Sequence, residues 1–176
     1  MPRVLPTIRI LGIDPGSRVT GYGIIESDGV RSTYVSSGCI RASDSEFPAR
    51  LKTIFDGVAA VVGEFTPDEI AVEQVFVSKS VQSALKLGQA RGAALAAALA
   101  RSLPVSEYAP NAIKRAVTGQ GHADKVQVQH MVRVLMRLSQ PLAADAADAL
   151  AVALCHAHSN PVMSRNEAIR QMGRRR

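Results

Sequence analysis

The stretch Ile8-Arg9-Ile10-Leu11-Gly12-Ile13-Asp14-Pro15-Gly16 opens with a short β-rich apolar run and closes on an acidic residue followed by a turn signal. A second apolar run, Thr20 to Ile25, follows that turn, and a third, Tyr34 to Ile40, follows Ser27-Asp28-Gly29 at hairpin-like distance. Apolar runs separated by Gly, Pro, Asp and Ser at such spacings are typical of antiparallel strands. The sequence therefore predicts a sheet that opens with three antiparallel strands, the first of which ends at Asp14.

Downstream of this sheet the apolar period changes. Between Pro48 and Phe65, apolar residues recur at three- and four-residue steps, which predicts an amphipathic helix packed on the sheet. The run Ile70 to Val72 is expected to form a buried fourth strand that ends on Glu73, and Val105 to Tyr108 a fifth. Further helices are expected over Val81–Ala100, Pro110–Val117, Lys125–Leu138 and Ala143–His158. The predicted fold class is α/β, with a five-stranded mixed sheet flanked by helices.

Gly88 and Gly92 lie inside the small-residue helix predicted over Val81–Ala100. Glycines at this spacing allow another backbone to approach a helix closely. That backbone could belong to the sheet of the same chain or to a second copy of the protein, and we favour packing on the sheet.

The chain has 176 residues, 47% of them apolar, which is enough for one sizeable core. We expect a flexible N-terminus over residues 1–7, a single domain over 8–159 and a basic, disordered tail over 160–176 that touches nucleic acid nonspecifically. Twenty-one Lys and Arg residues against 15 Asp and Glu give a formal charge of +6. This surplus points to a polyanionic partner, nucleic acid first, although excess charge can also simply aid solubility.

Cysteine usage and hydropathy indicate where the protein works. Cys39 and Cys155 lie far apart in sequence and form neither a disulfide framework nor a Cys-x-x-Cys metal motif. No apolar segment is long enough to span a membrane, and residues 1–7 contain no signal-peptide apolar region. We therefore expect a protein of the reducing cytoplasm that is neither exported nor membrane-bound.

Four acidic residues share an unusual apolar setting: Asp14, Glu73, Asp145 and Asp148. A buried carboxylate is costly unless it is paired, hydrogen-bonded or bound to metal. Asp145 and Asp148 lie three residues apart and share one helix face near its N-terminus, where the two strand-end acids could converge. Alternatively, a strand-end acid can cap a turn, and acids in a first helical turn can complement the helix dipole.

Four hard oxygen ligands suit Mg²⁺, with Mn²⁺ as a substitute. Two such ions about 4 Å apart would activate water and stabilise the leaving oxygen in a phosphoryl displacement. The acids therefore predict a metal-dependent phosphodiesterase that acts on a nucleic-acid backbone.

Several long motifs resemble the RuvC family of crossover junction endodeoxyribonucleases. They run in order along the chain, from about Ile10 to His158, as Gly12-Ile13-Asp14-Pro15-Gly16-Ser17-Arg18-Val19-Thr20-Gly21-Tyr22-Gly23, Glu73-Gln74-Val75-Phe76, Ser83-Ala84-Leu85-Lys86-Leu87-Gly88-Gln89-Ala90-Arg91-Gly92 and Asp145-Ala146-Ala147-Asp148-Ala149-Leu150-Ala151. The resemblance implies a ribonuclease H-like fold and a homodimer that nicks two opposing strands of a four-way Holliday junction symmetrically during recombination and repair. It also implies Mg²⁺ held by the four acids, and cooperation with the RuvA and RuvB branch-migration proteins.

Phe76 and four basic residues are candidate DNA contacts. Phe76 taken alone would be read as a core residue, but the resemblance places it at the junction, where an aromatic can stack on an exposed base. Lys114 and Lys125 flank the Gly119-Gln120-Gly121 linker and are the contacts that the family pattern favours, either by positioning phosphate or by stabilising its developing charge. Lys79 and Arg18 are weaker candidates, since charges on loops are often simply solvated.

The four histidines, at positions 122, 130, 156 and 158, are interpreted as structural or solvated rather than as a metal site. Asp14-Pro15-Gly16 followed by a glycine-bearing hairpin also resembles the phosphate-binding loop of actin-like ATPases, but those proteins need two such domains. An RNA-processing nuclease of the same fold and a noncatalytic junction-binding protein would also be compatible with these motifs. The four intact acids disfavour the noncatalytic protein.

Overall fold

A five-stranded sheet in the order β3-β2-β1-β4-β5 forms the centre of the computed structural model, which describes residues 7–43, 46–75 and 80–159. The strands are β1 (Ile8–Asp14), β2 (Val19–Ser27), β3 (Ser32–Arg41), β4 (Glu69–Glu73) and β5 (Val105–Tyr108). The first three strands pair antiparallel, while β4 runs parallel to both β1 and β5. The predicted mixed sheet with three antiparallel opening strands is confirmed.

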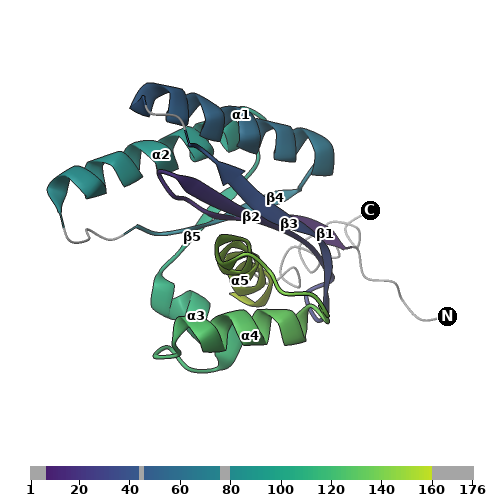
Figure 1. Ribbon diagram of the computed structural model, residues 1–176. Coiled ribbons are helices and arrows are strands. Elements are labelled where there is room, and N and C mark those ends of the chain that lie inside the picture. Colours follow the sequence, from purple (N-terminus) through teal and green to yellow (C-terminus); the bar gives the residue numbers. More distant parts are fainter. Residues whose placement is uncertain (1–6, 44–45, 76–79, 160–176) are drawn as a thin grey trace, which may run out of the picture.

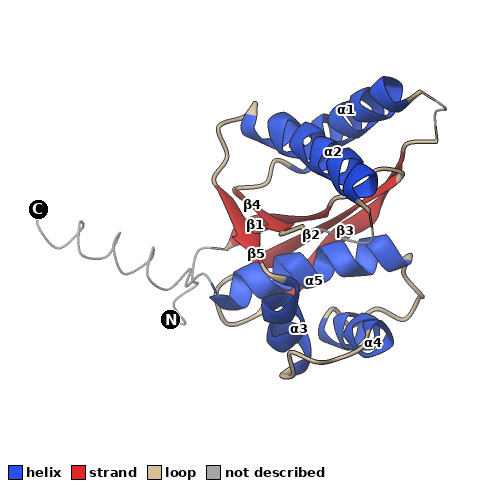
Figure 2. Ribbon diagram, turned by 90° about the vertical axis from the view of Figure 1, so that its left-hand side faces the viewer, coloured by secondary structure: helices blue, strands red, loops and turns tan. Residues whose placement is uncertain are grey.

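Helices cover both faces of the sheet (Figures 1 and 2). They are α1 (Phe47–Phe65), α2 (Val81–Leu99), α3 (Pro110–Thr118), α4 (Lys125–Leu135) and α5 (Ala144–Ser159). α1 and α2 lie on one face, whereas α5 lies on the other, with α3 and α4 outside it. Because α5 is enclosed between the sheet and two helices, every residue from 146 to 157 except Asp148 is buried. An apolar surface on all sides of a helix suits this position.

Three glycines let α5 lie directly on the backbone of β1 and β2. A Cβ atom at Gly12 would overlap the carbonyl oxygen of Ala149, and one at Gly21 would overlap that of Asp145. At Gly23 it would come within 2.8 Å of the Leu150 backbone nitrogen. A side chain at any of these positions would push the helix away from the strands. The glycines therefore set how closely the acids of α5 approach the end of β1.

The predicted helix Lys125–Leu138 is too long at its C-terminal end. α4 ends at Leu135, and Arg137 has a φ of 54°, in the left-handed region that cannot continue a helix. The apolar spacing that suggested the longer helix arises because Leu138 still packs against the core beyond the helix end. The other predicted elements agree with the observed bounds to within two residues.

The small-residue helix around Gly88 to Ala100 packs on the core that it shares with the sheet, as expected, but Gly88 and Gly92 take no part in this packing. Both glycines are exposed, and no atom of the described chain lies within 4 Å of a Cβ built at either position. α2 instead buries its alanines, at positions 90, 94, 97 and 98, against the core under α1. Small residues thus perform the predicted close packing, but from a different face of the helix.

The predicted terminal segments fall mainly outside the described residues. Residues 1–6 of the expected flexible N-terminus and the whole basic tail, 160–176, belong to the part that is not described. Among the helices that are described, none combines the length and apolar character needed to cross a membrane.

Candidate active site

Asp14 and Glu73 end two neighbouring parallel strands. The last paired residues of β1 and β4 are Ile13 and Val72, so the two acids follow this pair side by side. Side chains alternate along a strand, and Asp14 therefore faces the same side as Gly12, towards α5. The carboxyl ends of parallel strands are where α/β folds commonly place their ligand sites.

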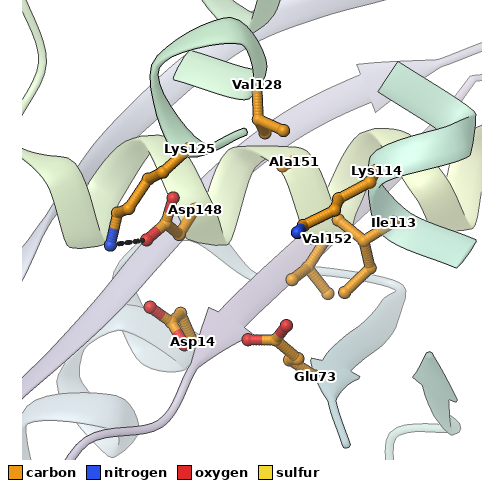
Figure 3. A pocket seen from close by; sticks show the side chains of 9 residues that line it. All are labelled: Asp14, Glu73, Ile113, Lys114, Lys125, Val128, Asp148, Ala151 and Val152. Atoms are coloured by element: carbon orange, nitrogen blue, oxygen red, sulfur yellow. Dashed lines mark ion pairs between the residues drawn. The ribbon is translucent and has the colours of Figure 1, made fainter. Parts of the chain in front are cut away.

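Asp148 reaches this point from α5, on the opposite wall. Asp14, Glu73 and Asp148 line a cavity of about 310 Å³, and Figure 3 shows their carboxylates directed into it from two strands and a helix. Asp145 does not line the cavity, but its charge is close enough to contribute to the raised pKa of Asp14. Three of the four acids therefore line one cavity, and Asp145 lies outside its lining.

The rest of the cavity wall combines two ammonium groups with apolar side chains. Lys114 comes from α3 and Lys125 from the first turn of α4, while the apolar lining residues are Ile113, Val128, Ala151 and Val152. A second, larger cavity of about 530 Å³ is lined by residues 31–34 and 135–137 and contains none of the predicted site residues. By volume alone, the second cavity would be the candidate active site, but the charged side chains that converge on the first cavity make it the better candidate.

Burial and mutual repulsion raise the pKa values of two acids of the cavity, Asp14 and Glu73. Burial first, and then the negative charges of Glu73, Asp148 and Asp145, raise the pKa of Asp14 from 3.8 to about 8. A side-chain hydrogen bond with Glu73 raises the pKa of Asp14 further. Burial also raises the pKa of Glu73, although this hydrogen bond and the two lysines oppose the rise. Like-charged carboxylates held this close are characteristic of a functional site rather than of a structural pair.

Lys125 neutralises part of this charge. Its Nζ atom lies 2.7 Å from Oδ2 of Asp148, and the hydrogen bond to that carboxylate raises the pKa of Lys125. The position of Lys125 is fixed by a capping box, because Asp124 accepts a hydrogen bond from the backbone N–H of Gln127 and the Gln127 side chain accepts one from that of Asp124. The ammonium group therefore stands at a well-defined helix start.

The donor set of the cavity fits a hard divalent cation by its chemistry. All three lining acids offer carboxylate oxygens, the ligands that Mg²⁺ and Mn²⁺ prefer, and an added cation would relieve the repulsion around Asp14. In the present arrangement Asp148 pairs with Lys125, and Asp14 with Glu73. Within residues 7–43, 46–75 and 80–159, no three His, Cys, Asp or Glu side chains already surround a common metal position.

The remaining candidate residues have different outcomes. Phe76 and Lys79 lie outside the described residues. Arg18 is exposed and does not line the cavity. His122, His130 and His158 are exposed, and Cys39 and Cys155 are free.

Sequence reasoning missed two features of the site. The first is the close approach at Gly12, Gly21 and Gly23, for which the recurrence of glycine on one strand face was the available indication. The second is a buried hydrogen-bonded group formed by Glu69, Tyr108 and His156, at the far end of the contact between β4 and α5. A histidine at the end of the apolar stretch Ala149 to Cys155 was the indication of this group.

Comparisons with known proteins agree with this geometry. The family model described as "Crossover junction endodeoxyribonuclease RuvC" matches residues 10–156. The crossover junction endodeoxyribonuclease RuvC of Vibrio campbellii is 58% identical over 154 residues, which cover 88% of this chain and 89% of the relative. That of Shewanella piezotolerans is 58% identical over 151 residues, 86% of this chain and 87% of the relative.

Solved structures give the same result. Thermus thermophilus RuvC in complex with a Holliday junction substrate superposes with a TM-score of 0.80 at 35% identity, covering 86% of this chain and 94% of that one. The yeast mitochondrial Holliday junction resolvase Ydc2 superposes with a TM-score of 0.63 at 12% identity, covering 96% and 88%, which shows a shared fold alone. The fold is therefore ribonuclease H-like, as predicted.

Proposed function

Because the chain belongs to the RuvC family of crossover junction endodeoxyribonucleases, we propose that the carboxylate cavity is the centre at which it nicks four-way DNA junctions. The protein is a nuclease that hydrolyses DNA phosphodiester bonds and resolves Holliday junctions. The observation that carries the assignment of the cavity is the convergence of Asp14, Glu73 and Asp148 on one 310 Å³ space, with Asp145 at its edge.

The four acids are proposed to hold Mg²⁺, with Mn²⁺ as a substitute and two ions per site. When bound, such ions lower the pKa of a coordinated water and offset the charge that develops on the phosphate oxygens. The acids suit this role because β1, β4 and α5 hold them close together although burial and mutual repulsion both oppose their charged forms. Their rigid origin at two strand ends and one buried helix would hold the ligand oxygens in place without a large reorganisation.

Lys114 and Lys125 are proposed to bind and orient the scissile phosphate. Both ammonium groups line the cavity, and the raised pKa of Lys125 keeps its charge at neutral pH. Lys125 would exchange its bond to Asp148 for one to a phosphate oxygen, because a cation bound by Asp148 would neutralise the charge that now attracts the lysine. The apolar lining of Ile113, Val128 and Val152 would limit water to the reacting position.

Phe76, Lys79 and Arg18 are proposed as outer DNA contacts. In the sequence, Phe76 and Lys79 come shortly after Glu73, the last residue of β4. Arg18 is exposed four residues after Asp14, where a backbone phosphate beside the cavity could reach it. These roles rest on the family resemblance and on position in the chain.

A homodimer would supply the two centres that symmetric nicking requires. An exposed stripe on α2 supports this proposal: Val81 and Leu85 are 74% and 63% exposed, and Gly88 and Gly92 continue the stripe at helical spacing without a neighbour in the described chain. Bare glycines beside exposed apolar residues would allow two helices to pack closely. The RuvA and RuvB proteins are proposed as partners and the cytoplasm as the location, in keeping with the family.

The test of the proposed function is incubation of the protein with labelled four-way junction, linear duplex and RNA hairpin, each with and without Mg²⁺. We expect paired nicks in opposing strands of the junction, only with the cation, and little cutting of the duplex. Preferential cutting of the hairpin would instead indicate an RNA-processing nuclease. Equal cutting of all three substrates would remove the assignment to junctions.

A further inference from the structure

A buried histidine joins three elements, α5, β4 and β5. His156 of α5 is 1% exposed, and its Nε2 atom lies 2.7 Å from Oε2 of Glu69, whose side chain is 8% exposed. Its Nδ1 atom lies 2.9 Å from the hydroxyl of Tyr108, and the two rings meet edge to face at 5.7 Å. Both ring nitrogens are therefore engaged, and the imidazole itself is almost completely buried.

His156 and its partners lie on, or directly before, elements that carry residues of the proposed site. Glu69 begins β4, which ends on Glu73. Tyr108 ends β5 directly opposite Glu73 in the β4–β5 ladder, and α3 with Lys114 begins two residues later. His156 itself lies on α5, which carries Asp148. The three side chains thus tie together β4, which supplies Glu73, α5, which supplies Asp148, and β5, which leads into the helix that supplies Lys114.

The spans along β4 and α5 match. Four residues of strand separate Glu69 from Glu73, a distance of about 13 Å at 3.2 to 3.4 Å per residue. Eight residues of helix separate Asp148 from His156, about 12 Å at 1.5 Å per residue. When His156 meets Glu69 at one end of this contact, Asp148 is consequently brought level with Glu73 at the other.

Little else in the interface provides directional bonding along the helix axis. The face of α5 between the two ends is made of Ala, Val and Leu side chains, whose apolar contacts are non-directional. The three glycines of β1 and β2 set the distance from the helix to the sheet. Hydrogen bonds to His156 restrict both distance and angle, so they can fix the position of α5 along its own axis.

We propose that His156 is a positioning residue for junction cleavage: with Glu69 and Tyr108 it fixes the register of α5 on the sheet, and hence the separation of Asp148 from Glu73. This inference rests on the proposed function of the acid cavity. It gives His156 no contact with DNA and no part in proton transfer. A shift of α5 by about 1 Å would move the acids out of their productive arrangement, and displacements of this size can cost about 100-fold in rate.

The test must separate positioning from simple stability. Removing His156 alone would deprive the buried Glu69 carboxylate of this hydrogen bond, and the protein could unfold for that reason. In the triple variant Glu69→Met, Tyr108→Phe, His156→Leu, all three polar groups become apolar at similar volume, which can leave stability nearly unchanged. The directional bonds are lost while the burial is kept.

Single-turnover nicking of a prebound junction is measured in the wild-type protein and the variants, together with junction affinity, Mg²⁺ affinity by calorimetry and thermal unfolding. In the folded triple variant we expect the rate to fall by about 10- to 100-fold, junction affinity to stay within about twofold, and Mg²⁺ to bind severalfold more weakly. Glu69→Gln, which retains an acceptor for His156, and the exposed His158→Gln on the same helix should both stay close to the wild-type rate.

A folded triple variant that cleaves at the wild-type rate would overturn the inference, as would a loss accounted for by weaker junction binding. If the triple variant does not fold, Tyr108→Phe decides: it removes one hydroxyl, and a severalfold slower rate at unchanged affinity supports the positioning role, whereas an unchanged rate overturns it. Failure of the wild-type protein to nick junctions would overturn the proposed function instead. The ratio of Mg²⁺ affinities would then still decide whether His156 sets the register.

Discussion

The two ends of the contact between β4 and α5 each contain a glutamate, and the two glutamates have opposite kinds of neighbour. Glu69 and Glu73 lie on the same face of one short strand, four residues apart. At one end Glu69 bonds to the imidazole of His156. At the other, Glu73 stands beside Asp14 and Asp148, and the pKa values of both Glu73 and Asp14 are raised. The acid has a hydrogen-bonding partner where the fold is held together, and it has like-charged neighbours where a ligand is expected, as at many functional sites.

Neutralising one acid of the conflicting end should have the largest effect. We predict that Asp14→Asn lowers Mg²⁺-dependent junction nicking on the order of 1,000-fold or more, since cation binding supplies several kcal/mol of transition-state stabilisation. Junction binding should persist, because the basic residues remain. The control is Asp124→Asn, the same chemical change at the start of α4, where asparagine caps a helix equally well. Retained nicking in Asp14→Asn would remove Asp14 from the catalytic centre.

The second prediction concerns stability against pH without divalent cations. The folded protein holds the pKa of Asp14 at about 8, against an ordinary value of 3.8. Between these values the folded state binds more protons than the unfolded state, so the free energy of unfolding should fall as the pH rises from about 4 to 8. The loss should be on the order of 4 kcal/mol.

Denaturant unfolding at a series of pH values in EDTA measures this slope. Asp14→Asn should flatten it, whereas Asp124→Asn should not. A free energy of unfolding that rises with pH in the wild-type protein would contradict the raised pKa of Asp14. So would a pH dependence that is the same in Asp14→Asn.

The third prediction concerns the glycines that bring the two ends of α5 onto the sheet. Gly21→Ala should destabilise the protein by about 3 kcal/mol, because the new methyl overlaps the Asp145 carbonyl and forces the backbone to shift. The matched change Gly88→Ala, at an exposed helical position with no neighbour in the described chain, should stabilise the subunit by up to about 1 kcal/mol. Urea unfolding compares the two, and equal effects would show that the close approach of α5 is not constrained.

Much of the fold could be predicted from the sequence because its pattern is local. The alternation around Ile8 to Asp14, the turn residues and the three- and four-residue spacing over Pro48 to Phe65 each depend on neighbours in the chain, and each predicted the correct element. The four acids were identifiable for a related reason, since each interrupts an apolar run.

The remaining features depend on residues that are distant in sequence. His156 and Glu69 are separated by 87 positions and His156 and Tyr108 by 48, so no local sequence pattern predicts their hydrogen bonds. The helix predicted to reach Leu138 failed because Arg137 adopts a left-handed conformation that composition does not reveal. The spacing of Gly88 and Gly92 suggested a close approach that neither makes in the described chain, because spacing alone cannot tell which face of a helix turns inward.

The smallest expected effect concerns the lysines that face the conflicting end. Lys114→Ala should weaken junction binding and lower the slope of log affinity against log salt by roughly one, the value for one lost phosphate contact. Lys52 provides the control. It is exposed on α1, on the face of the sheet away from the cavity, and pairs with Asp56 of the same helix. Lys52→Ala should leave the slope unchanged. An unchanged slope in Lys114→Ala would place Lys114 outside the DNA footprint.

Thermal unfolding during a Mg²⁺ titration tests most directly whether the acids of the cavity bind a cation. A ligand that binds only the folded state raises its stability with concentration. We predict that Mg²⁺ raises the unfolding temperature of the wild-type protein and of Glu69→Gln alike, and that most of this rise disappears in Asp14→Asn. An equal rise in Asp14→Asn would contradict the account, because the cation would then bind somewhere other than the cavity where Asp14, Glu73 and Asp148 meet.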